Sequence, residues 1–393
     1  MKEFSLEKRI QNRNSNIELL RILCMLSIIA DHFVGQSGIA EYSTWISCVF
    51  FNISFSRAAC GVFIIISAWY SVEKKMNINK IFHTWFTVAV YTIPIMGYMM
   101  HLKFFIDKKA YISAFYPIQK TPLWFAGCYI IILLFMPILN HIILTIDRSL
   151  LIWALFCGGV LISLYPMVVA DTATFENDLL ALIYIYLLTG YIRVYVKKIP
   201  SAKVCILVFS IIFLFCTFIN AAGSYFDNEM IINIKLYGDI LKTKIEVLPN
   251  IIMEYAIFFF FLNIKPVNSR LINKLSSATL GVYCLHQVPA WNYYIWQNIF
   301  HADFYSKSLI GWKRYIYVIL VILVVWLVGT FIEIARMKLT RLLIEERKGY
   351  KKLCNFIEET IYTPKKKQNY VFMFVFFTIY FLTTKIMFGG FLW

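Results

Sequence analysis

Long apolar runs separated by short polar loops follow one another along the whole chain. Eleven runs have about the 17–25 residues that a membrane-spanning helix needs. They cover residues 17–36, 50–72, 80–101, 123–144, 150–169, 178–196, 202–220, 248–264, 276–299, 315–335 and 369–388. The pattern predicts an all-α, polytopic membrane helical bundle with about ten core transmembrane helices and an eleventh near the C-terminus.

The spacing of these runs also predicts how the chain is divided. We expect a cytoplasmic N-terminal segment (1–15), a transmembrane domain (16–336), a basic cytoplasmic linker (337–368) and a C-terminal transmembrane helix (369–393). Residues 45–52 read as an interfacial lead-in to the second span. Since no long polar segment remains for a soluble catalytic domain, any chemistry is expected inside the membrane bundle.

Composition supports the membrane interpretation. The chain is 60% hydrophobic and only 15% charged, with a mean hydropathy of +0.68, whereas soluble domains are about 45–50% apolar and about 25% charged. The nine cysteines include no CxxC pair, so we interpret them as apolar fillers of helices. No zinc-type spacing occurs, and no metal site is expected.

The net charge of +16 comes from basic residues clustered between the apolar runs. With the N-terminus in the cytoplasm, alternate loops contain 25 Lys and Arg residues on the inner side and 11 on the outer side. Because cytoplasmic loops carry the excess of basic residues, this orientation is predicted. The clusters follow membrane topology and lack the features of nucleic-acid recognition, so no nucleic-acid partner is expected.

Two ionisable residues in the first span share one helix face. Arg21 and His32 are eleven positions apart, which places them about 20° from alignment and about 16 Å apart along the axis. Asp31 is rotated about 100° from His32 and reads as a bystander. Arg21 could be a cytoplasmic anchor paired with Glu18, and His32 could reach the outer interface. Together, however, they suggest a site for a long ligand such as a pantetheine arm.

Further polar or interfacial residues lie in or beside later spans, and each could have an ordinary structural role instead of a functional one. Arg57 is a second buried cation that needs a partner, and Glu254 could form an ion pair with it or bind a ligand. Ser67 could simply bond to a helix carbonyl. Trp124 is placed as an interfacial anchor. His286 lies mid-span, before Pro289, which would free backbone carbonyls.

Buried histidines and arginines in a membrane bundle fit two classes of function. In acyl transfer, a histidine acts as base and arginines hold an anionic donor. In transport, such residues line the path of an anion, a sugar or a proton. Composition alone does not decide between them.

Four motifs, in order along the chain, resemble those of the acyltransferase-3 family of bacterial integral-membrane acyltransferases. Arg21 and His32, with ten residues between them, match its hallmark in the first helix. SRAACGVFIIISAWY keeps the family's serine as Ser67, with alanine in place of the following glycine. PLWFAGCYII contains the Leu-Trp-Phe pattern at Trp124, and LGVYCLHQV contains Tyr-x-x-His at Tyr283 and His286. One departure is the third helix, which begins NINKIFHTWF where many members have an arginine cluster.

The resemblance implies transfer of an acyl group, usually acetyl, from cytoplasmic acyl-CoA to a hydroxyl of a cell-surface polysaccharide or its lipid-linked precursor. The opening most resembles enzymes of capsule or exopolysaccharide O-acetylation. The expected location is the bacterial plasma membrane, and the expected partners are the bilayer, acyl-CoA and the glycan acceptor. No bound cofactor is implied, with acetyl-CoA acting as donor substrate. A polytopic transporter, flippase or polymerase for a glycan or anionic substrate is the alternative.

The same resemblance suggests roles for individual residues. His32 would act as base or as transient acyl carrier, with Arg21 at the CoA end. The expected acyl-CoA-binding residues are Arg21, Lys74, Lys75 and Ser67. Those expected to hold the acceptor or stabilise the oxyanion are Arg57, Trp124, Glu254, Tyr283 and His286.

Overall fold

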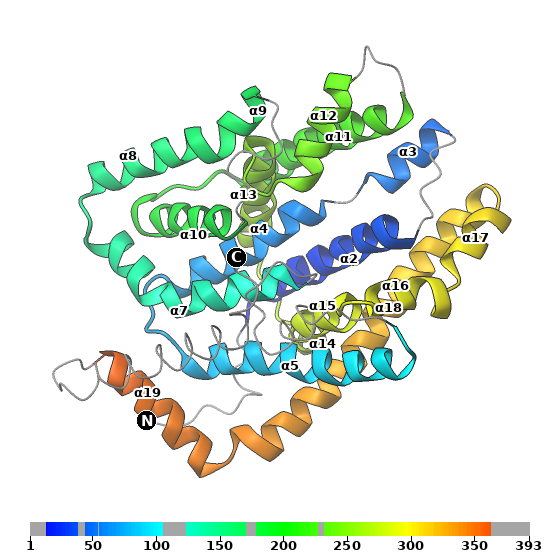
Figure 1. Cartoon of the computed structure of the whole chain (residues 1–393). Helices are drawn as coiled ribbons and strands as arrows, with labels where there is room; N and C mark the ends of the chain where they lie inside the picture. Colours follow the sequence, from blue (N-terminus) through cyan, green and yellow to red (C-terminus); the bar gives the residue numbers. More distant parts are fainter. Residues whose placement is uncertain are drawn as a thin grey trace, which may run out of the picture.

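The computed structural model describes residues 13–37, 44–53, 55–104, 123–169, 178–226 and 232–362. Within these ranges it contains helices and no strands (Figure 1), which confirms the all-α class. The first half comprises α2 (Ser15–Ser37), α3 (Trp45–Phe51), α4 (Ser56–Ser71), α5 (Ile78–His101), α7 (Trp124–Thr145), α8 (Arg148–Gly158), π-helix η1 (Gly159–Leu164), α9 (Tyr165–Val169) and α10 (Asp178–Tyr195).

The second half continues the bundle. It comprises α11 (Ala202–Tyr225), α12 (Ile232–Thr243), α13 (Leu248–Asn263), α14 (Arg270–Ser276), α15 (Thr279–Gln287), α16 (Trp291–Tyr294), π-helix η3 (Ile295–Ile299), α17 (Ala302–Ser308), α18 (Trp312–Thr340), π-helix η4 (Arg341–Glu345) and α19 (Lys348–Tyr362). The nine cysteines form no disulfide, as the apolar-filler interpretation predicts.

Several helices are long and apolar enough to cross a membrane, so the chain is a multi-pass membrane protein. Six pass this test among the described residues, or seven if a pair bent by 42° counts as one span. They are Trp45–Ser71, Trp124–Thr145, Arg148–Val169, Asp178–Tyr195, Ala202–Tyr225 and Trp312–Glu345, with the bent pair Leu236–Thr243 and Leu248–Asn263. The predicted span at 369–388 lies outside the described residues. The full count of ten or eleven spans therefore stays a prediction.

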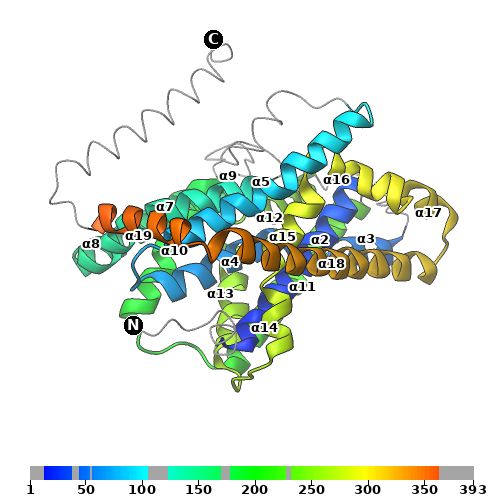
Figure 2. The same ribbon diagram turned by 90° about the horizontal axis from the view of Figure 1, so that it is seen from below.

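Helix α2 lies in the middle of the bundle, where it contacts α4, α13, α15 and α18 (Figures 1 and 2). Its side chains Leu20, Ile29 and Phe33 are fully buried. At its start, Ser15 Oγ donates to Asn273 Oδ1 of α14 at 2.7 Å. Of the charged groups of α2, Glu18 is buried between helices, whereas Arg21 and Asp31 are partly exposed.

The predicted single span at 276–299 is wrong. The helix α15 ends at Gln287, and the chain turns through Pro289 and Ala290, which has a positive φ of 64°, before α16 begins. Proline lacks an N–H and clashes with the preceding turn, and together with the positive φ of Ala290 it ends the helix here. The break leaves His286 in the last turn of α15.

Two glycines allow helices to approach buried carboxyl groups. A Cβ at Gly61 of α4 would lie 2.2 Å from Cδ of Glu254 on α13, and a Cβ at Gly281 of α15 would lie 2.2 Å from Cδ of Glu333 on α18. Carbon atoms in contact need about 3.5–4.0 Å. Each glycine therefore makes room for one glutamate.

The first of these contacts gives a testable prediction. Gly61→Ala is expected to lower the free energy of unfolding by about 1–3 kcal/mol, the usual cost of overpacking a core. The check is thermal unfolding of the purified chain in detergent. Gly97→Ala on α5 is the matched control, because no atom lies within 4 Å of a Cβ at that position. Equal stability of the two variants would contradict the close packing of α4 against α13.

The last described helix, α19, covers the start of α5. Glu358 Oε1 of α19 accepts a hydrogen bond from the backbone N–H of Ile78 at 2.8 Å, and the rings of Tyr350 and Phe82 lie 5.2 Å apart. Both views show α19 beside α5 (Figures 1 and 2). Because the first N–H groups of a helix lack partners within it, Glu358 caps α5 from a distant part of the sequence.

Candidate active site

Two histidines meet at the far end of α2. His32 Nδ1 lies 3.0 Å from Nε2 of His286, and His286 Nδ1 lies 2.6 Å from the carbonyl oxygen of Val282, one turn earlier on α15. His286 is fully buried. The break after α15 places its last turn against α2, so the two rings face each other across that contact.

These contacts fix which nitrogens carry protons when both rings are neutral. A carbonyl oxygen can only accept, so His286 Nδ1 carries a hydrogen and its Nε2 has a lone pair. His32 Nδ1 must then donate to that lone pair, which leaves Nε2 of His32 without a proton. His32 therefore has one nitrogen free to accept a proton, and His286 holds its ring in place. This is the arrangement of a general base.

Aromatic side chains surround the histidine pair. The ring of Tyr283 lies 6.4 Å from that of His32 and 6.3 Å from that of Phe125, and Phe125 in turn packs edge-on against Trp124 at 5.8 Å. The sequence placed Trp124, Tyr283 and His286 in one group of candidates, and their rings form a continuous row beside His32. This row, in which Phe125 connects Trp124 with Tyr283, forms an aromatic wall on one side of the histidine pair.

Arg57 links this wall to the start of α10. Its guanidinium lies 5.1 Å from the ring centre of Trp124 and 3.7 Å from a carboxylate oxygen of Asp178. It is also close enough to act electrostatically on His32. Of the two alternatives left open for Glu254, the ion pair with Arg57 is not seen among the described residues, where Arg57 is paired with Asp178.

A second group of polar side chains lies at the opposite end of α2. Arg21 Nη1 is 3.6 Å from Oε2 of Glu18, which is the pairing that the anchor alternative for Arg21 requires. Glu18 also accepts a 2.6 Å hydrogen bond from Ser276. Arg21 Nε is buried and has no hydrogen-bond partner among the described residues.

Near Arg21, the structure adds two residues that the sequence reasoning did not select for the site. The hydroxyl of Tyr129 lies 3.2 Å from Ser67 Oγ, and Lys80 Nζ donates to the same Ser67 oxygen at 3.5 Å. Lys80 also lies over the Tyr129 ring at 5.3 Å, and Arg21 acts electrostatically on Tyr129. Ser67 is thus bonded to other helices, and Lys74 and Lys75 lie exposed on the loop after α4.

Glu254 lies between the two ends of α2. It is fully buried against Gly61, and it interacts electrostatically with Cys24 and Cys60. Neither carboxylate oxygen has a hydrogen-bond partner among the described residues. Cys24 is one turn from Arg21 and two turns from His32, so Glu254 lies beside the middle of α2.

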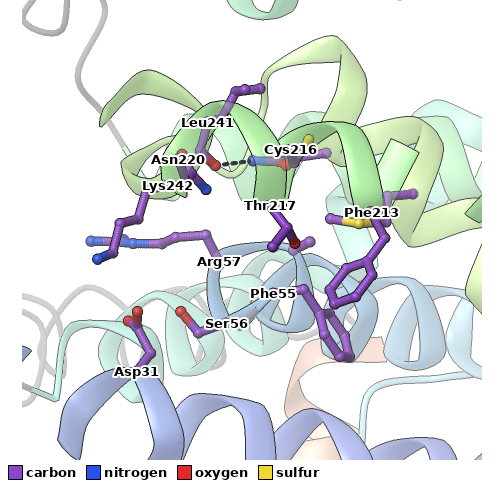
Figure 3. Close-up of a pocket in the computed structure, with 13 residues that line it drawn as sticks. Asp31, Phe55, Ser56, Arg57, Phe213, Cys216, Thr217, Asn220, Leu241 and Lys242 are labelled. Atoms are coloured by element: carbon purple, nitrogen blue, oxygen red, sulfur yellow. Dashed lines mark hydrogen bonds between the residues drawn. The ribbon is translucent and has the colours of Figure 1, made fainter. Parts of the chain in front are cut away.

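A pocket opens beside the histidine end of α2, between α4, α11, α12 and α13. Its cavity volume is about 20 Å³, which is room for about one water molecule. In Figure 3, the side chains of Arg57 and Lys242 approach each other from opposite walls, with Asp31 and Ser56 below them. Asp31, which the helix geometry left as a bystander, lines this pocket. Within the described residues, no group of three His, Cys, Asp or Glu side chains could hold a metal ion.

Comparison with known families gives one match. The family described as an acyltransferase domain, Acyl_transf_3, matches residues 14–332. Its bounds run from the start of α2 to within α18, so both ends of α2, the histidine pair and the pocket all lie inside it. No curated protein and no solved structure matches the chain.

Proposed function

This chain belongs to the acyltransferase-3 family of membrane acyltransferases, and from that premise we propose that it moves an acetyl group from acetyl-CoA to a hydroxyl of a cell-surface polysaccharide or its lipid-linked precursor. The observation that carries this proposal is the hydrogen-bonded pair of His32 and His286. It leaves one imidazole nitrogen as an acceptor inside the bundle, where a hydroxyl nucleophile needs a base.

In the proposed reaction, His32 Nε2 removes the proton from the acceptor hydroxyl as its oxygen attacks the thioester carbonyl. A C–O bond forms, and the C–S bond then breaks. The CoA thiolate leaves and takes the proton from His32. His286 holds the His32 ring through its Nε2 and is itself held by Val282, so we assign it as a positioning residue and not as an oxyanion donor.

The donor is proposed to enter from the Arg21 end. Arg21 and Lys80 carry positive charge beside Ser67 and Tyr129, and Lys74 with Lys75 adds two exposed cations on the adjoining loop. Cations of this kind bind phosphate groups through charge-assisted hydrogen bonds. The CoA diphosphate would stay at this end while the pantetheine arm passes Glu254 and reaches His32, along about 16 Å of helix.

The acceptor and the oxyanion are proposed to lie at the His32 end. Arg57 is near enough to stabilise negative charge that develops on the thioester oxygen, and Trp124 and Tyr283 supply the surrounding wall. In the full topology we propose ten core spans and an eleventh in the bacterial plasma membrane, with a cytoplasmic N-terminus. This orientation places the Arg21 end on the side where CoA is available and makes capsule or exopolysaccharide the natural acceptor.

The proposal is tested by reconstituting the full chain in liposomes with acetyl-CoA labelled in its acetyl group. We expect label to move to de-O-acetylated surface polysaccharide taken from cells that express the protein, with release of one CoA thiol per acetyl group. A transporter or polymerase would release no CoA. Absence of both CoA release and label transfer from wild-type protein would overturn the proposed function.

Arg21 gives a prediction about the donor end. Arg21→Gln is expected to raise the KM for acetyl-CoA about tenfold or more, because one charge-assisted contact to a phosphate is worth about 1.5–3 kcal/mol. The KM for the polysaccharide should stay within about twofold of the wild-type value, because the substitution removes a contact to acetyl-CoA only. Initial rates at varied acetyl-CoA check this, with Arg270→Gln on α14 as an exposed control. An unchanged acetyl-CoA KM would exclude Arg21 from the donor site.

A further inference from the structure

We propose that the outer face of α19 lies on the surface of the bilayer and binds the headgroups of anionic phospholipids. This helix follows the part of the chain that matches the acyltransferase domain, and the inference does not depend on the proposed reaction. The inner face of α19 packs on the start of α5. Tyr350 donates a hydrogen bond to Asn79, Glu358 caps Ile78, and Cys354 between them is buried. The opposite face is therefore left for another partner.

The preceding helix places α19 near the level of the headgroups. Helix α18 and η4 form one candidate span, Trp312–Glu345, in which residues 315–332 contain no charged side chain. That stretch has about the length that crosses the hydrocarbon core. The exposed Lys338 comes after it and is expected outside the core, where a charge costs less. In Figure 1, α19 turns away from α18 just beyond this point.

The outer face of α19 is partly apolar. Leu353 is 55% exposed and Phe356 is 52% exposed, and residues three positions apart lie side by side on a helix. Leu342 and Leu343 of η4 are exposed as well. These four side chains continue the exposed apolar surface of α18 onto α19. A membrane span carries such a surface because lipid covers it, and the continuity favours lipid as the partner of α19 too.

Basic side chains lie beside this apolar stripe. Lys348 and Lys352 are both exposed and are four positions apart, so they share one side of the helix. A lysine can lay its apolar stem along the bilayer while its ammonium group reaches the headgroups. A helix with leucine and phenylalanine on one side and lysines on the next lies in the plane of the interface. The positive charge selects anionic headgroups over neutral ones.

Hydrogen–deuterium exchange measured by mass spectrometry tests this assignment on the full chain. The chain is placed in nanodiscs that each hold one copy, made either of phosphatidylcholine alone or of equal parts of phosphatidylcholine and phosphatidylglycerol. We expect the amides of residues 348–358 to exchange about tenfold or more slowly with phosphatidylglycerol, because each basic residue near an anionic surface is worth about a fivefold change in an equilibrium. The difference should disappear at about 1 M salt, where the Debye length is only about 3 Å.

Two variants separate the charged and apolar parts of the face. Lys348→Gln with Lys352→Gln should abolish the effect of phosphatidylglycerol, whereas the matched pair Lys197→Gln with Lys198→Gln, at exposed positions after α10, should keep it. Leu353→Gln should speed exchange of α19 about tenfold in discs of either composition, since burying one leucine is worth about 1.5–3 kcal/mol. Glutamine and leucine have similar helix propensities, so the helix itself is not weakened.

Three results would overturn the assignment. They are equal exchange of α19 in the two kinds of disc, a phosphatidylglycerol effect that survives the Lys348→Gln and Lys352→Gln changes, and protection that appears only in discs holding two copies. The last would assign this face to a second copy of the chain. Unchanged exchange of α2 shows that each variant is folded. Since the readout is exchange and not acetyl transfer, failure here leaves the proposed function untouched.

Discussion

His32→Ala is expected to reduce acetyl transfer by about 10²–10⁴-fold, the contribution that a positioned general base usually makes. The substitution removes the Nε2 lone pair, which the contact from His286 leaves free to accept a proton. The measurement is transfer of labelled acetyl groups to de-O-acetylated polysaccharide by the reconstituted chain. The acetyl-CoA KM should change little, because Arg21 and Lys80 lie at the other end of α2.

The neighbouring histidine provides the comparison. His286→Gln removes the ring that orients His32, yet leaves His32 in place, so a smaller loss of about 10–100-fold is expected, as for residues that orient a ligand. The rate should also show a changed pH profile, because His32 Nδ1 loses the imidazole nitrogen that accepts its hydrogen. Full activity of His32→Ala, at normal protein levels, would remove the base from the proposed mechanism.

A measurement of protein mass separates two roles of His32. If the histidine carries the acetyl group itself, incubation with acetyl-CoA in the absence of acceptor gives a protein heavier by one acetyl group, and hydroxylamine removes it. If His32 acts only as a base, the mass stays unchanged. The bonding of Nδ1 to His286 is compatible with either role, since Nε2 is available in both.

Arg336→Leu is expected to lower the free energy of unfolding by about 3–5 kcal/mol, the cost of breaking a buried ion pair on one side. Arg336 on α18 donates to both oxygens of Glu333, at 2.6 and 2.7 Å. Glu333 is 1% exposed and also accepts a hydrogen bond from Tyr91 of α5 at 2.8 Å. Without Arg336, a buried carboxylate loses its counter-charge.

Thermal unfolding in detergent checks this prediction, and a double variant gives the control. Glu333→Leu with Arg336→Leu removes both charges together, and such replacements are often neutral or stabilising. The double variant should therefore be more stable than Arg336→Leu alone. If the single and double variants lose equal stability, the effect comes from packing and not from the ion pair.

Much of the site could be predicted from the sequence because its residues lie at fixed distances on single helices. The eleven-residue spacing of Arg21 and His32 puts them on one face of any straight helix, and α2 is one uninterrupted helix. The pairing of Arg21 with Glu18 at i−3 follows from the same geometry. The segment 45–52, read as a lead-in to the second span, contains the short helix α3, and its interfacial position stays a prediction.

Contacts between distant helices could not be predicted in this way. Tyr129 and Lys80 meet at Ser67 only because α4, α5 and α7 pack together, and nothing in the local pattern relates their positions. Helix periodicity correctly put Asp31 on a different face from His32, but it could not show that α11 and α12 form a pocket on that face. The ion pair of Arg57 with Asp178 could not be predicted either, because Asp178 lies at the start of α10, far from Arg57 in the sequence.

The glutamate at the start of α2 has a consequence for turnover. Glu18 already holds Arg21 in the empty protein, with Ser276 fixing the carboxylate. In the proposed role, binding of the donor is then an exchange of one anion for another at the same guanidinium, not the capture of a phosphate by a free cation. Such an exchange limits how tightly the spent CoA is held. When CoA leaves, the Glu18 carboxylate pairs with Arg21 again. This re-pairing favours product release.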